Sequence, residues 1–290
     1  MQTYNPNNNQ GNQTDNYQNY NYGGNNYGGG TNGYYDNGNS GANYNYDANY
    51  NYGNQGQYQN PYNNQGYMDM NLKTVATQEV VAKSFLFMVV ALIITAVASL
   101  TTSPLIAYRM LTGNGFFILL IAELAIVMVS NWAVSKNNAI LAGVLFAVYS
   151  YLTGVTCSIL FVAYTTASIT VIFLVTAAIF AIMAIFGLVT KKDLSSAGSI
   201  LMMGLLGIII VSFVNLFLLK SSMLDTIICG IGVLIFVGLT AYDTQKIKRL
   251  VAVSNDGNVL TLALMGAFEL YLDFINLFLK LLRLFGKRRN

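Results

Sequence analysis

The sequence contains no histidine. This absence excludes Ser-His hydrolysis, Cys-His nucleophiles, His-ligated metal sites and the side chain that most often changes charge near neutral pH. Any proton-linked behaviour must therefore come from carboxylates. The two cysteines, Cys157 and Cys229, lie inside apolar runs, and we interpret them as small buried hydrophobic residues rather than as a disulfide or metal ligands.

Charged residues are scarce as well. Only 9% of the 290 residues are charged, whereas about a quarter are charged in a typical soluble domain. All 15 Lys and Arg residues lie beyond residue 67, in a part of the chain that is rich in aliphatic residues. So few charges over so long an apolar stretch predict a polytopic membrane domain.

Residues 1–67 have a different composition, dominated by Asn, Gln, Gly and Tyr. They contain no Lys or Arg, only three acidic residues and 14 of the 20 tyrosines. Such a segment buries too little aliphatic surface to offset the entropy of ordering, so we predict a disordered tail over residues 1–70. The tyrosines favour either a solvated spacer or weak contacts with protein partners. Without basic residues the tail is not expected to bind nucleic acid.

From Ser84 onward, apolar stretches of membrane-spanning length are separated by short polar segments. We predict an all-α, seven-helix transmembrane domain over residues 75–286. The join near residues 161–166 is the least marked, and only the length of the apolar stretch requires a turn there. The predicted spans are 84–103, 116–134, 139–160, 167–189, 198–219, 223–249 and 259–284.

The basic residues predict the orientation, because positively charged loops stay in the cytoplasm. With a cytoplasmic N-terminus, the inner loops carry eight basic residues, and the outer loops before the C-terminus carry only Arg109 and Lys220. Seven spans then place Lys287, Arg288 and Arg289 outside. Either the earlier charges overrule these three, which we favour, or the seventh segment is not a plain span. We predict a multi-pass protein of a bacterial plasma (inner) membrane. The inner-loop residues are Lys73, Lys83, Lys136, Lys191, Lys192, Lys246, Lys248 and Arg249.

Four acidic residues, Glu123, Asp243, Glu269 and Asp273, fall within the predicted spans. A lone carboxylate in the bilayer centre costs at least ~2.5 kcal/mol, so such residues usually face a protein or water-filled interior. Asp243 and Glu269 also lie near helix ends, where water could solvate them.

The spacing favours a pair between Asp243 and Asp273. They lie 13 residues before and 17 residues after Asp256, the centre of the polar turn between the last two spans. In an antiparallel hairpin this difference is ~6 Å of helix rise, so both can lie at a similar depth. Two adjacent carboxylates can share a proton or bind a cation, and a shared proton makes the pair respond closer to neutral pH.

A second pair follows from the orientation. Glu123 in the second span and Arg283 in the seventh both belong to the outer half of the bundle. An ion pair would satisfy both charges, although Arg283 could also reach the membrane surface with its long side chain.

Two sequence motifs resemble the Bax inhibitor family of multi-pass proteins. One is Ala241-Tyr242-Asp243-Thr244-Gln245; the other runs from Leu270 through Asp273 to Phe278 and on to Arg283. The resemblance covers roughly residues 75–285. It implies a seven-helix fold with a central last helix and a pH-governed calcium leak through an aspartate pair. Asp243 and Asp273 match that pair, and Glu123 and Arg283 match a further charged pair.

The sequence departs from the family at one position. Some members carry an arginine near the inner end of the second span that latches onto the aspartate of the sixth helix. Here that region reads Asn131-Trp132-Ala133-Val134-Ser135-Lys136, so only Lys136 is a candidate latch.

The leading hypothesis is therefore a calcium leak channel in which Asp243 and Asp273 bind calcium transiently. Carboxylate oxygens suit this permeating ion, and we expect no cofactor, no enzyme activity and a monomer. One alternative is a non-transporting regulator or assembly factor that acts through protein partners. A remoter alternative is an intramembrane aspartyl protease, because two aspartates on adjacent helices also occur there. The Gly-x-Gly-Asp pattern of those proteases is replaced here by Leu270-Tyr271-Leu272-Asp273.

Overall fold

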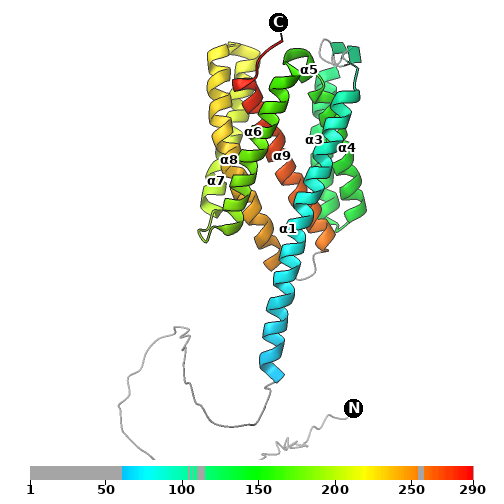
Figure 1. The fold of residues 1–290 in the computed structure, drawn as a ribbon, viewed down its shortest axis with the longest axis vertical. Coiled ribbons are helices and arrows are strands. Elements are labelled where there is room, and N and C mark those ends of the chain that lie inside the picture. Colours follow the sequence, from blue (N-terminus) through cyan, green and yellow to red (C-terminus); the bar gives the residue numbers. More distant parts are fainter. Residues whose placement is uncertain (1–60, 104, 107, 110–114, 254–257, 290) are drawn as a thin grey trace, which may run out of the picture. The chain divides into compact units, whose positions relative to one another are not determined.

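The computed structural model of the chain describes residues 61–103, 105–106, 108–109, 115–253 and 258–289. The described part is helical apart from short links (Figure 1). Most of the predicted tail, and the turn around Asp256, lie outside the described residues. The first helix begins at Pro61, before the predicted end of the tail at residue 70. The elements are α1 (Pro61–Thr101), α3 (Gly115–Ser135), α4 (Ala139–Cys157), α5 (Leu160–Ala163), α6 (Thr166–Val189), α7 (Ser195–Val214), η1 (Asn215–Leu219), α8 (Ser222–Val253) and α9 (Val259–Phe285).

The seven-helix prediction is confirmed. Within the described part of the chain, six segments are long and apolar enough to cross a membrane, and they begin in α1, α4, α6, α7, α8 and α9. α3 adds the shorter apolar stretch Ile121–Ser135. The uncertain join after α4 consists of the single-turn helix α5 and a link that ends at Thr165. The side-chain oxygen of Thr165 accepts a hydrogen bond from the Ser168 backbone N–H and so marks the start of α6.

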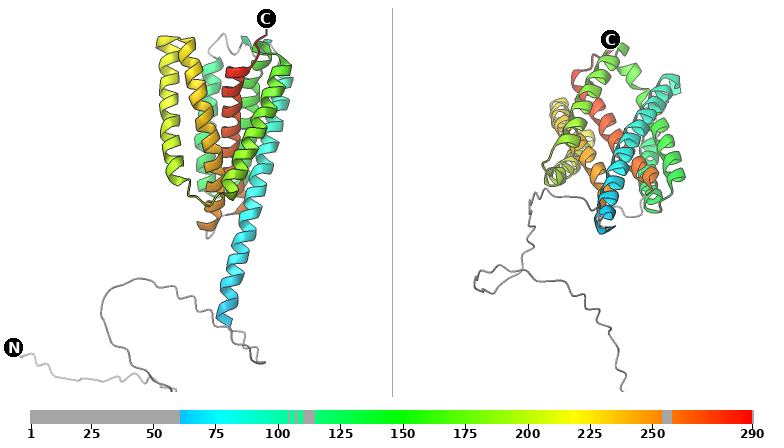
Figure 2. Two further views of the ribbon diagram at one scale, coloured as in Figure 1. Left: turned by 60° about the vertical axis from the view of Figure 1, so that its left-hand side comes forward. Right: turned by 60° about the horizontal axis from the view of Figure 1, so that its bottom comes forward.

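The last helix lies at the centre of the bundle, as predicted. In an apolar stretch of 18 residues of α9, 67% of the residues are buried, compared with 6–39% in the corresponding stretches of the other five long segments. α9 packs against α1, α8, α6 and α4, and Figure 2 shows it among these helices in both views. Three of its large side chains, Leu270, Tyr271 and Leu277, are fully buried. Because α9 is surrounded by protein, its polar side chains must find partners on neighbouring helices.

One such partnership ties α9 to two other helices. The Tyr271 hydroxyl lies 2.7 Å from the Thr95 hydroxyl of α1, and the same Thr95 hydroxyl donates to the Ser150 carbonyl oxygen of α4. The Tyr271 ring also packs edge-on against Phe146 of α4, with ring centroids 5.5 Å apart. These contacts hold the middle of α9 in place.

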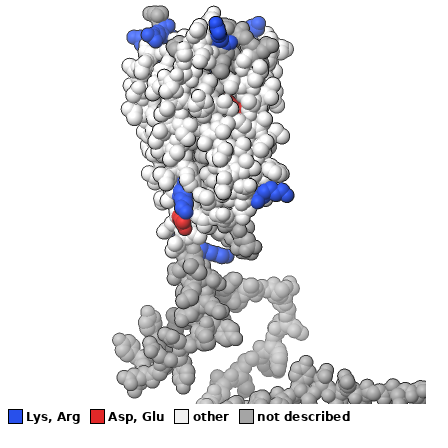
Figure 3. Space-filling model, turned by 90° about the vertical axis from the view of Figure 1, so that its right-hand side faces the viewer, with Lys and Arg blue, Asp and Glu red and all other residues white. Residues whose placement is uncertain are grey.

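On one face of the bundle, the Lys and Arg side chains lie toward its two ends, and the wide band between them shows neither (Figure 3). The C-terminal end of α9 lies at the end opposite the Asp243-bearing end of α8 and the first turns of α1 (Figure 1). Seven is an odd number of spans, so the start of the first span and the end of the last must lie at opposite ends of the bundle. At the C-terminal end of α9, Thr165 and Arg289 make backbone hydrogen bonds with Lys287 and Ala163, respectively.

Candidate functional site

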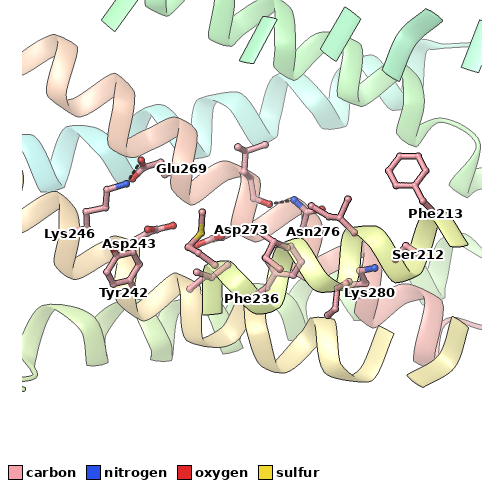
Figure 4. A pocket seen from close by; sticks show the side chains of 16 residues that line it. Ser212, Phe213, Phe236, Tyr242, Asp243, Lys246, Glu269, Asp273, Asn276 and Lys280 are labelled. Carbon is pink, nitrogen blue, oxygen red and sulfur yellow. Dashed lines mark hydrogen bonds and ion pairs between the residues drawn. The ribbon is translucent and has the colours of Figure 1, made fainter. Parts of the chain in front are cut away.

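The predicted aspartate pair is brought together between α8 and α9. Asp243 of α8 and Asp273 of α9 line the same cavity, and Figure 4 shows both side chains directed toward the same space. Asp273 is only 4% exposed, and its Oδ2 atom has no hydrogen-bond partner among the residues that the structure describes. A buried carboxylate oxygen without a donor is costly unless it holds a proton or meets a cation.

The pair lines a cavity of about 500 Å³ between α7, α8 and α9. Apolar side chains of all three helices form most of its wall. The other charged and amide groups on the wall come from α8 and α9 (Figure 4). They are Lys246, Glu269, Asn276 and Lys280.

An ion pair joins the same two helices beside the aspartates. Lys246 Nζ lies 2.5 Å from Glu269 Oε1, and these side chains are 32% and 22% exposed. Lys246 follows Asp243 by three residues on α8, and Glu269 precedes Asp273 by four residues on α9. One helical turn therefore separates the ion pair from the aspartates. The second Glu269 oxygen, Oε2, is buried without a hydrogen-bond partner.

From the sequence, Lys246 was used only as a sign of topology. Glu269 was one of the four acids within the predicted spans, with solvation near a helix end as the alternative, and it was given no partner. The i+3 and i−4 spacings from the two aspartates were the signal that could have found this pair, since residues at those spacings share a helix face. Lys280, which also lines the cavity, lies two turns from Asp273 on α9.

The predicted pair between Glu123 and Arg283 is not formed, and this prediction is corrected. Glu123 of α3 accepts a hydrogen bond from the Thr156 hydroxyl of α4, 3.0 Å away. Arg283 of α9 instead pairs with Asp225 in the first turn of α8, also at 3.0 Å. The two residues do share the outer half of the bundle. Depth along the helix axes could be read from the sequence, but the side of α9 from which each neighbour approaches could not.

Lys136 does not act as a latch in this structure. It is an exposed residue at the end of α3, a helix that packs mainly on α4. No ion pair to Lys136 occurs among the described residues. Lys246 of α8, and not Lys136, lines the same cavity as the two aspartates.

Two glycines allow α6 and α7 to approach the part of α8 that carries Asp243. A Cβ atom at Gly187 of α6 would overlap the Ala241 carbonyl oxygen, and one at Gly198 of α7 would overlap the Tyr242 ring. Ala241 and Tyr242 directly precede Asp243, so the position of this aspartate depends on these close approaches.

Comparison with known proteins gives concordant matches. A family model described as "Inhibitor of apoptosis-promoting Bax1" matches residues 77–290. The inner membrane protein YbhL of Escherichia coli (strain K12) is 44% identical over 218 residues, which cover 73% of this chain and 93% of YbhL. An uncharacterized protein of Rickettsia prowazekii is 42% identical over 212 residues, or 72% of this chain and 89% of the relative. These matches confirm the predicted multi-pass location in an inner membrane.

Proposed function

Since the chain belongs to the Bax inhibitor family, we propose that it is a calcium leak channel whose flux is governed by protonation of Asp243 and Asp273. The observation that carries this proposal is the aspartate pair between α8 and α9, in which Asp273 is buried, Asp243 is half-buried and both line the 500 Å³ cavity. The cavity provides carboxylate oxygens inside a bundle of apolar helices. Such oxygens are the ligands that calcium prefers.

The proposed mechanism depends on the charge of the pair. When both carboxylates are ionised, they repel each other and attract a divalent cation from the cavity. When they share a proton, one carboxyl donates a hydrogen bond to the other and the pair loses most of its attraction for calcium. Because the pair bridges α8 and α9, the same proton also changes the force between these helices. Protonation therefore shifts the balance between closed and open arrangements.

The test is calcium flux into proteoliposomes that contain the full chain and a calcium-sensitive dye. Initial rates are measured from mildly acidic to mildly alkaline pH for the wild type, Asp243→Asn, Asp273→Asn and the double variant. We expect flux that changes with pH in the wild type and loses this dependence in all three variants. Asparagine has nearly the shape of aspartate, and helical content measured by circular dichroism checks that each variant is folded.

A matched control is Glu79→Gln, which neutralises an exposed acid of α1 that pairs with Lys83 at 2.7 Å. This variant should keep the pH profile of the wild type. A wild-type flux independent of pH, or an unchanged profile in the double variant, would contradict the proposal.

A further inference from the structure

A second cavity lies at the inner end of the bundle, away from the aspartate pair. It has a volume of about 980 Å³ and is bounded by α1, the inner end of α6 with the following link, and α8. α1 and α6 each pack on α8, so α8 forms the floor between them. Val81 and Ala82 of α1 and Leu188 of α6 supply an apolar part of the wall. We call this space the inner groove.

The polar part of the inner groove is strongly cationic. It carries Lys191 and Lys192 from the α6–α7 link and Lys248 and Arg249 from α8, against a single acid, Asp193. Arg249 is already paired with Asp193 at 2.6 Å. No ion pair to the three lysines occurs among the described residues. Three positive charges of the inner groove are therefore available to an anion.

The link that carries two of these lysines is fixed rather than loosely solvated. Gln245 of α8 is only 7% exposed. Its side-chain amide donates to the Lys192 carbonyl oxygen at 2.9 Å and accepts from the Leu194 backbone N–H at 2.9 Å. A loop that served only to set the topology by its charge would need no such buried attachment. The attachment holds the cations beside the apolar wall.

We propose that the inner groove binds the phosphate group of an anionic glycerophospholipid from the inner leaflet. The three lysines meet the phosphate, and the glycerol and first acyl carbons lie along the apolar wall formed by α1 and α6. Basic pockets between transmembrane helices on the cytoplasmic side suit such headgroups. The joint presence of cationic and apolar walls favours an amphiphile over a free anion.

The experiment measures thermal unfolding of the purified full chain in uncharged detergent. The probes are phosphatidylglycerol, phosphatidylcholine and inorganic phosphate at matched concentrations. Phosphatidylglycerol at ten times its dissociation constant should raise the unfolding midpoint by about 3–6 °C. The other two probes should not. The triple variant Lys191→Gln, Lys192→Gln, Lys248→Gln should lose most of this shift.

A matched control removes the same charge from the other end of the bundle. Lys287, Arg288 and Arg289 are exposed there, and their triple Gln variant should keep the full shift. Equal loss of the shift in both triple variants would mean non-specific attraction and overturn the proposal. An equal shift with inorganic phosphate would identify a soluble anion as the ligand and would overturn it too, as would no difference between the two lipids. None of these outcomes depends on calcium flux.

Discussion

The ion pair between Lys246 and Glu269 allows a quantitative test of what holds α8 against α9 beside the cavity. Its atoms are 2.5 Å apart, and both side chains are at least two thirds buried. Lys246→Met keeps the length and much of the volume of the side chain but removes the charge. The variant leaves Glu269 without its cation. The second Glu269 oxygen is already buried without a hydrogen-bond partner, so the carboxylate loses its one compensating contact among the described residues.

The expected size follows from two opposing contributions. Two unit charges 4 Å apart attract by about 4 kcal/mol at an effective dielectric constant of 20. Desolvation and the ordering of two long side chains offset much of this attraction. We expect Lys246→Met or Glu269→Gln to lower the free energy of unfolding by about 1–3 kcal/mol each. The double variant should lose less than the sum, with a coupling of about 1–2 kcal/mol.

The assay is a double-mutant cycle on the free energy of unfolding, measured by denaturant titration in detergent micelles. The control cycle uses Lys83 and Glu79, an i,i+4 pair at 2.7 Å with side chains that are 39% and 48% exposed. That pair should couple by only about 0.3–0.5 kcal/mol. Additive effects at Lys246 and Glu269, within about 0.5 kcal/mol, would refute the reasoning.

Two further predictions concern the supports of α8. Gly187→Ala should lower the free energy of unfolding by about 1–3 kcal/mol, because the new Cβ overlaps the Ala241 carbonyl oxygen. A Cβ atom at Gly207 would have no neighbour within 4 Å, so Gly207→Ala should be neutral or stabilising. Equal losses of unfolding free energy in the two variants, measured by denaturant titration, would contradict this. Hydrogen bonds from Ser195 and contact with Arg249 hold the pKa of Asp193 below its ordinary value of 3.8. This stabilisation is complete above pH 3.8 and disappears as the pH falls through the lower folded-state pKa. Thermal unfolding midpoints of wild type and Asp193→Asn should therefore converge at strongly acidic pH, and a constant difference would contradict the assignment.

The aspartate pair could be predicted from the sequence because both residues belong to one antiparallel hairpin. Residue spacing on either side of a turn converts directly into depth along the helix axes. For Glu123 and Arg283 the same kind of reasoning gave the right half of the bundle and the wrong partners. Those residues are separated by several helices in the chain, and spacing contains no information about which helix lies on which side of α9.

The Lys246–Glu269 pair was missed for a different reason. A lysine near the inner end of a span fits the positive-inside rule, so topology alone accounted for it. Only the helix-face relation to Asp243 and Asp273 distinguishes this lysine from the exposed Lys136 or Lys248. The central place of α9 was easier to predict through the family resemblance, since it follows from the fold and not from a single contact.

α8 carries residues of both proposed sites, the aspartate pair and the inner groove, and so connects them. Gln245, which fixes the α6–α7 link in the inner groove, is two residues from Asp243. Lys246 is the next residue of α8, and its ion pair with Glu269 connects α8 to α9. A helix resists bending within a single turn because its backbone hydrogen bonds span four residues. A lipid bound to the cations around Gln245 would therefore favour one position of this turn, and with it one distance between Asp243 and Asp273. If both proposals hold, anionic lipid should shift the pH dependence of calcium flux in the wild type and leave it unshifted in the triple lysine variant of the inner groove.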